Sequence, residues 1–164
     1  MLSAKMNKAL NQQIRLELFS GYSYLAMAAY FDHEELFGFA KWFRVQAKEE
    51  LGHAMKFFDY VSDAGGKVEL LAVDAPRLEF KSAEEVFKQG LEHEQRVTAE
   101  INKLMDAAHA EKDHATASML LWFVNEQVEE EANFSAAITR IKTAGCQSGL
   151  LFLDHHFGKR GEGK

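Results

Sequence analysis

The sequence predicts an all-α protein, a four-helix bundle with one long crossover connection and a short fifth C-terminal helix. Four long segments carry apolar residues at intervals of three and four, which is the period of a helix with one buried face. The only proline is Pro76, and 7 of the 11 glycines lie outside these four segments. Outside a possible short extended piece at 68–73, no segment alternates apolar and polar residues as a strand does.

The first two helices are expected over about residues 3–32 and 35–64. Ser3 precedes the first periodic segment and can accept a hydrogen bond from the free N–H groups of its first turn. The glycines at 65–66 can adopt the left-handed conformation that ends many helices. Because the joint between the two segments is short, we expect the two helices to be antiparallel neighbours.

The long connection at 65–82 precedes a second helical pair. Ser82, followed three residues later by Glu85, is typical of a capping box and predicts a third helix that ends near Ala110. After a short turn at 111–113, a fourth helix is expected to about Lys142. The connection is long enough to run the length of the bundle, so the topology has one crossover.

The chain is expected to form a single domain over residues 1–164. Within it, residues 1–145 would make the four-helix bundle, and residues 146–158 contain the fifth helix, expected at 147–157. Residues 159–164 are rich in glycine and charge and are expected to form a flexible tail.

Composition excludes several classes of function. The net charge is −6, with 25 acidic against 19 basic residues, which argues against nucleic acid as a partner and favours cations. The single cysteine, Cys146, cannot form an internal disulfide, and the first residues lack the apolar segment of a secretory signal. No stretch reaches the roughly 18 apolar residues of a membrane span. We therefore expect a cytoplasmic protein with no membrane contact.

Each of the four long helices places acid on its apolar seam near mid-length. Glu17 lies in the first seam, Glu50 with His53 in the second, Glu94 in the third, and Glu130 with Gln127 in the fourth. In an antiparallel bundle, the mid-length positions of the four helices lie at the same height along the bundle axis. The i, i+3 spacing of Glu50 and His53 puts both side chains on one helix face.

Four carboxylates in one buried layer cannot all stay ionised without partners, because each unpaired buried charge costs several kcal/mol. No lysine or arginine lies on these seams. Two divalent iron ions would balance four glutamates and accept His53 as a nitrogen ligand. A purely structural bundle with a buried polar network is the alternative, and it leaves these acids without a counter-charge.

The sequence resembles the bacterial non-haem ferritins over residues 1–158. The resemblance lies in Glu17, in EELGHA at 49–54, in LEHE at 91–94 and in NEQVEEE at 125–131. It implies a ferritin-like fold, a first iron site from Glu17, Glu50 and His53, and a second from Glu50, Glu94 and Glu130 with Gln127 nearby. It also implies a third iron position, formed by Glu49, Glu126, Glu129 and Glu130.

The resemblance further implies iron storage. The chain would oxidise ferrous iron with dioxygen or peroxide at an intra-subunit di-iron site and keep ferric mineral inside a homo-oligomeric shell, a 24-mer. No haem is expected, because the haem-binding relatives have a methionine where Leu51 stands. The main alternative is a rubrerythrin-like peroxide-reducing enzyme, which needs a Cys-x-x-Cys iron domain that one cysteine cannot build.

Several other residues have a role only by interpretation. Tyr24 follows Glu17 on the same face and is expected to bond a site carboxylate or supply an electron, and Trp122 is a weaker candidate. We expect three histidines to be exposed and Glu111 with His114 to form a solvated turn. The exposed histidines are His33, His93 and His109. Counting from NEQV, the positions that line acidic channels in animal-type ferritins fall on Ala117 and Leu120.

Overall fold

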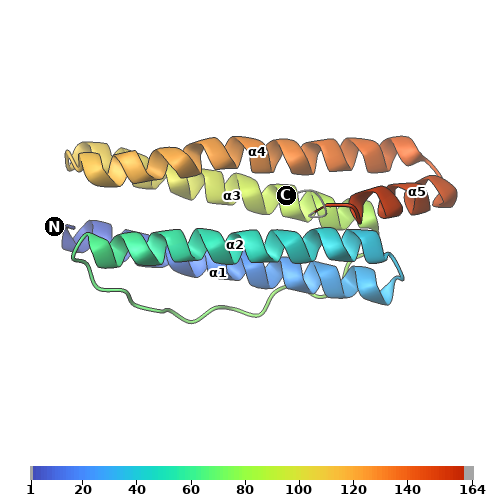
Figure 1. Cartoon of the computed structure of the whole chain (residues 1–164), viewed down its shortest axis with the longest axis horizontal. Helices are drawn as coiled ribbons and strands as arrows, with labels where there is room; N and C mark the ends of the chain where they lie inside the picture. Colours follow the sequence, from blue (N-terminus) through green and yellow to red (C-terminus); the bar gives the residue numbers. More distant parts are fainter. Residues whose placement is uncertain (1, 161–164) are drawn as a thin grey trace.

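The computed structural model describes residues 2–160, which form five α-helices and no strand within that range (Figure 1). The elements are α1 (Ala4–His33), α2 (Phe37–Asp63), α3 (Ala83–Ala110), α4 (His114–Ala144) and α5 (Gln147–Phe157). Residues 161–164 of the expected tail lie outside the described residues. The predicted all-α fold class is confirmed.

The four long helices form two antiparallel pairs. α1 packs along α2, α3 packs along α4, and the crossover at 64–82 runs back along the outside of the first pair to the start of α3 (Figure 1). The short α5 folds back from the end of α4 and contacts both α2 and α4. This is the single-crossover topology that the short joints predicted.

Three of the long helices begin at residues whose side chains satisfy free backbone N–H groups. Ser3 Oγ accepts from Met6 N at 3.0 Å, and Asp113 caps α4 by accepting from Thr116 N at 3.1 Å. Ser82 accepts from Glu85 N at 3.2 Å, so the predicted start of α3 is confirmed.

The ends of α2 show how backbone conformation sets a boundary. The helix begins at Phe37, two residues after the predicted Glu35, because Glu35 has a left-handed φ of 57° that helical geometry excludes. At the other end, Gly65 has a φ of 73° and stops the helix as predicted. Boundary shifts of this size leave the helical seams in register.

The expected extended piece at 68–73 is not a strand in the described chain. Its backbone bonds to side chains of α1 in place of a neighbouring strand. Asn11 donates to Lys67 O at 2.9 Å and accepts from Glu69 N at 2.7 Å, and Arg15 donates to Ala72 O at 2.7 Å. Side chains of α1 therefore hold the crossover against the bundle.

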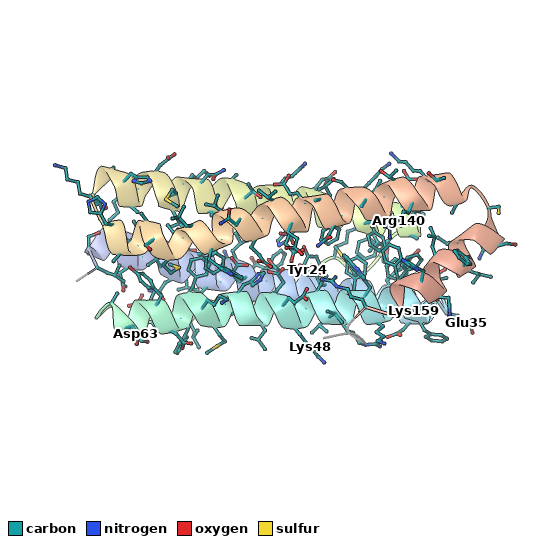
Figure 2. The ribbon with its side chains drawn as sticks, turned by 45° about the horizontal axis from the view of Figure 1, so that its top comes forward. Tyr24, Glu35, Lys48, Asp63, Arg140 and Lys159 are labelled. Carbon is teal, nitrogen blue, oxygen red and sulfur yellow. The ribbon has the colours of Figure 1, made fainter. Side chains whose placement is uncertain are left out.

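The core consists of two apolar clusters with the acids between them. One cluster is rich in aromatic rings, including Phe31, Phe43 and Phe87, and the other is mainly aliphatic, including Leu10 and Ile101. Burying each such side chain stabilises the fold by about 1.5–3 kcal/mol. Tyr24, which lies at the edge of the aromatic cluster beside the acid layer, is inside the bundle in Figure 2.

The helix α5 is fastened to the start of α2. Asp154 Oδ1 accepts a hydrogen bond from Phe39 N at 2.8 Å, and Gly38 lies against the Asp154 carbonyl. A side chain at Gly38 would place its Cβ 1.7 Å from that carbonyl oxygen, so only glycine permits the contact. The C-terminal segment is therefore positioned on the bundle by a side-chain hydrogen bond and by a close backbone contact.

Leu120 is completely buried in the aliphatic cluster and Ala117 is 8% exposed. Both positions that the count from NEQV gives for an acidic channel therefore carry apolar side chains that belong to the core. None of the helices in residues 2–160 combines the length and apolarity needed to cross a membrane.

Candidate metal centre

Glu17 brings a carboxylate from α1 into the middle of the bundle. It is 1% exposed, and Gln13, one turn earlier, donates from Nε2 to Glu17 Oε1 at 2.7 Å. Within residues 2–160 the other oxygen, Oε2, has no hydrogen-bond partner although it is buried. A buried carboxylate oxygen without a donor is costly, and a cation would remove that cost.

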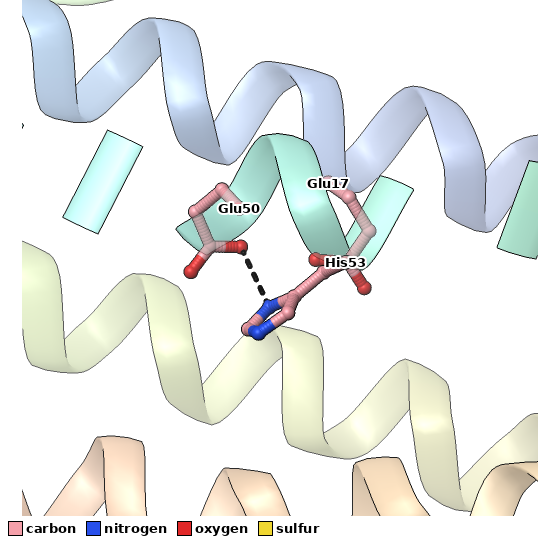
Figure 3. Close-up of side chains that lie close together, drawn as sticks. All are labelled: Glu17, Glu50 and His53. Atoms are coloured by element: carbon pink, nitrogen blue, oxygen red, sulfur yellow. Dashed lines mark ion pairs between the residues drawn. The ribbon is translucent and has the colours of Figure 1, made fainter. Parts of the chain in front are cut away.

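The helix α2 supplies Glu50 and His53 on the same face as predicted. Glu50 Oε2 lies 3.4 Å from His53 Nδ1, and its Oε1 is a second buried oxygen without a hydrogen-bond partner in the described chain. One ligand atom from each of Glu17, Glu50 and His53 falls within 4.8 Å of the others (Figure 3). This is the only such group of three or more found in residues 2–160.

The helices α3 and α4 supply Glu94, Gln127 and Glu130, and here three carboxylate oxygens have hydrogen-bond partners. The Tyr24 hydroxyl donates to Glu94 Oε1, and Gln127 Nε2 donates to Glu94 Oε2 at 3.0 Å. Gln46 Nε2 donates to Glu130 Oε2 at 2.9 Å. The structure therefore brings all six predicted seam residues into one layer, with Tyr24 beside it.

Burial dominates the electrostatics of this layer. It raises the pKa values of Glu17 and Glu50 well above the ordinary range, and charge on the neighbouring carboxylates raises them further. Burial also raises the pKa of Glu94 and that of Glu130 to about 7. Four such groups cannot all be ionised near neutral pH without positive charge close by.

The donor set fits hard or borderline divalent cations. Carboxylate oxygens with one imidazole suit iron, manganese or zinc, whereas thiolate-binding metals would need sulfur ligands that the layer lacks among the described residues. Glu17 and Glu50, which carry the two orphaned oxygens, each offer one ligand atom within 4.8 Å of that of His53. The arrangement can hold cations without any change of fold.

The acids implied for a third iron position lie on α2 and α4. Glu126 Oε1 is 3.9 Å from His53 Nε2, and Glu49 Oε2 pairs with Arg160 Nη2 at 2.6 Å. Glu129 is exposed and Glu130 points into the buried layer. No group of their ligand atoms meets within residues 2–160, so the third position stays a prediction.

The interpretation of His93 was wrong. The residue is 3% exposed, its Nε2 lies 2.6 Å from Ser20 Oγ, and its ring packs against Phe19 and Tyr24. Burial lowers its pKa to about 4, with Arg96 adding to the shift. The helical period alone could not show that α1 covers this part of α3.

The other histidine interpretations agree with the structure. His33 and His109 are exposed, Glu111 lies in an exposed turn, and His114 is the exposed first residue of α4. The Trp122 ring lies edge-on to His53 with centroids 5.4 Å apart, so it touches a candidate ligand. Three residues that sequence reasoning did not assign to the site are Gln13, Gln46 and Arg160; only Gln46, which lies on the second seam, could have been found from the helical pattern.

Comparisons with known proteins agree with this geometry. The family model described as "Ferritin-like domain" matches residues 7–144. The chain is 45% identical over 153 residues to a bacterial non-heme ferritin of Staphylococcus aureus, covering 93% of this chain and 92% of that one. A bacterial non-heme ferritin of Staphylococcus haemolyticus is 44% identical over the same shares.

Solved structures agree as closely. An open pore ferritin from Archaeoglobus fulgidus superposes with a TM-score of 0.96 at 47% identity, over 98% of this chain and 99% of that one. A structure described as a humanized archaeal ferritin gives a TM-score of 0.96 at 45% identity. These are likenesses over the whole bundle, including α5.

Fold and site together define a four-helix bundle built around a buried layer of carboxylates and one histidine. That class contains many proteins with different chemistry. The family match and the identities over nine-tenths of the chain are more specific, and they show that the chain belongs to the ferritin family.

Proposed function

We propose that this protein stores iron. It oxidises ferrous iron at the buried layer inside each subunit and keeps the ferric product in a hollow shell of identical subunits, a 24-mer. The observation that carries the proposal is that Glu17 Oε2 and Glu50 Oε1 are buried without hydrogen-bond partners in residues 2–160, on two residues that each offer a ligand atom within 4.8 Å of that of His53. The similarity to bacterial and archaeal ferritins supports iron as the cation.

The candidate ligands divide into two halves that share Glu50. Glu17, Glu50 and His53 would hold the first ferrous ion, and Glu50 would also reach a second one held by Glu94 and Glu130, with Gln127 beside it. Because several of these carboxyls hold protons near neutral pH, ferrous binding would release protons from the layer. The carboxylates that have lost these protons are negatively charged, and they attract the ferrous ions.

The redox step balances with two ferrous ions. Each gives up one electron, and the two electrons with two protons reduce dioxygen to hydrogen peroxide, or reduce peroxide to water. Carboxylate ligands favour the ferric over the ferrous state, because hard oxygen donors stabilise the higher charge. Tyr24, whose hydroxyl bonds Glu94, is placed to hold that ligand.

The product must leave toward the inside of the shell. Glu49, Glu126 and Glu129 lie on α2 and α4 beside the buried layer, and with Glu130 they would form a third iron position on the way out. Gln127 is an amide and so a weak ligand for ferric iron, which favours release. The proposal contains no haem, since Leu51, 53% exposed on α2, has no atom that ligates iron.

Aerobic addition of ferrous iron with simultaneous sizing tests the function. We expect fast oxidation, followed by a large particle that retains the added iron through a desalting column. Particle size and retained iron are followed by light scattering and a ferrous chelator. A small species that turns over peroxide without retaining iron would contradict storage and favour a rubrerythrin-like enzyme.

A further inference from the structure

The turn that follows α5 places the positively charged side chain of Arg160 beside an acid of the proposed third iron position. Arg160 Nη2 donates to Glu49 Oε2 at 2.6 Å across 111 residues of sequence. The guanidinium carbon also lies 4.7 Å from the centroid of the Trp42 ring, in a cation–π contact. The neighbouring Lys159 is labelled in Figure 2, beside α2.

The guanidinium is not fully satisfied where it lies. The Arg160 side chain is 24% exposed, and its Nη1 is buried without a hydrogen-bond partner in residues 2–160. Arginine prefers to bind carboxylates with two parallel hydrogen bonds, and here only one is made. Such a contact holds the arginine in place but leaves it easier to displace than a bidentate pair.

The charge of Arg160 reaches the buried layer as well as Glu49. Burial raises the pKa of Glu130 to about 7, and Arg160 opposes that rise. Glu49 and Glu130 are two of the four acids of the proposed third position. The positive charge of Arg160 therefore lies close to the same acids that a third metal ion would bind.

A purely structural role explains less. The helix α5 is already attached to α2 by the hydrogen bond from Phe39 N to Asp154 and by the close approach at Gly38. Phe157 also packs into the aromatic cluster. Arg160 adds only its contact with the Trp42 ring to this attachment, and the group that it neutralises is an acid of the proposed iron path.

We propose that Arg160 is a displaceable counter-ion of the inner acids: it pairs with Glu49 while no metal is bound there, and a cation must displace it to bind Glu49. This inference rests on the proposed function, since it requires the third metal position. By competing for Glu49, Arg160 lowers the affinity of that position and keeps iron from resting there. Product iron would then pass inward more readily than through an unopposed acid cluster.

Zinc binding to the apo cage tests the competition without redox chemistry. We expect isothermal titration of Arg160→Gln to show the third zinc per subunit bound at least threefold more tightly than in the unmodified protein, with the first two unchanged. Lys159→Gln is the matched control, because it removes the same charge from an exposed neighbour and should change nothing. Equal affinity for the third zinc in Arg160→Gln and the unmodified protein would overturn the inference.

A crystal structure of the unmodified protein with zinc keeps the test independent of any variant. We expect zinc on Glu49 with the Arg160 side chain moved off that carboxylate. Zinc on Glu49 with the ion pair intact overturns the role of Arg160 alone. If two zinc ions bind in the buried layer and no third binds to any variant, the third position fails and this inference fails with it, while the di-iron proposal stands.

Discussion

The two halves of the acid layer differ in how their oxygens are satisfied. On the α1 and α2 side, Glu17 and Glu50 each have a buried oxygen without a hydrogen-bond partner in residues 2–160. On the α3 and α4 side, donors from Tyr24, Gln127 and Gln46 bond the carboxylates of Glu94 and Glu130. The first half therefore has buried carboxylate oxygens that a cation could satisfy, whereas in the second half three carboxylate oxygens already accept hydrogen bonds.

This difference predicts an order of binding. A cation at Glu17, Glu50 and His53 gains one buried oxygen from each glutamate that has no hydrogen-bond partner in residues 2–160, whereas a cation at Glu94 and Glu130 must replace existing hydrogen bonds. A carboxylate that must give up a hydrogen bond to bind a metal costs more free energy than one whose oxygen has no hydrogen-bond partner. The first half should bind tightly and the second weakly, which suits a site that must release its product.

The largest expected effect comes from removing the shared ligand. Glu50→Ala should slow fast ferrous oxidation by roughly a hundredfold or more, because both halves lose a carboxylate. His53→Ala should do the same through the first half. Helical content should persist, since neutralising buried like charge relieves repulsion. Stopped-flow absorbance measures the rate, with Glu92→Ala as an exposed acid control; unchanged rates or lost helicity at neutral pH would refute the assignment.

The second prediction concerns the pH dependence of apo stability. Between pH 4.5 and about 7, folded Glu94 and Glu130 keep protons that the unfolded chain has lost. The free energy of unfolding should therefore fall as pH rises through this window, by up to about 1.4 kcal/mol per pKa unit for each group. Buried His93 acts in the opposite direction below pH 6.5, so the readout is a difference between proteins.

Thermal midpoints of the metal-free protein between pH 5.5 and 7.5 measure that slope. A Glu94→Gln, Glu130→Gln double variant should lose less stability over this range than the unmodified protein. Saturating zinc should also flatten the slope, because bound cations keep the carboxylates ionised in the folded state. A double variant with the same slope as the parent would contradict the electrostatic account.

The third prediction concerns the amide behind Glu17. Gln13 Nε2 orients Glu17 and favours its ionised form, so Gln13→Leu should weaken binding of the first metal by roughly tenfold. Binding of the second should change much less. Gln12→Leu, at an exposed neighbouring position, is the matched control. Equal weakening of both metals in a zinc titration would mean that the two halves are not independent.

The smallest expected effect is that of Tyr24→Phe. The change removes the hydroxyl that bonds Glu94 but keeps the ring packed against Phe43 and Phe134. We expect oxidation to slow only a few-fold, while the affinity for the first metal stays the same. Anaerobic titration and stopped-flow oxidation on the same preparation separate the two. If the affinity for the first metal also fell, Tyr24 would act on the Glu17, Glu50 and His53 half, contrary to this assignment.

Much of this arrangement could be predicted from the sequence because helical period is a local property. The apolar seams by themselves put the four glutamates and His53 at one level of the bundle. Capping at Ser82 and the glycine at 65 set helix ends through groups only a few residues apart. For such features the sequence contains the determining contacts.

Other features depend on contacts between distant segments. His93 is buried because α1 covers it, and Leu120 faces the core because of the rotation of α4. The pairing of Arg160 with Glu49 requires the turn after α5 to return to α2. The unequal satisfaction of the two halves also depends on amides from other turns and helices, which no single periodicity reveals.

A crystal of the metal-free protein, soaked anaerobically with one equivalent of ferrous iron per subunit, tests the inequality of the two halves most directly. Anomalous scattering at the iron edge then locates the metal. The account predicts a single strong peak between Glu17, Glu50 and His53, with the hydrogen bonds to Glu94 and Glu130 intact. A first peak between Glu94 and Glu130, or equal peaks in both halves, would contradict it.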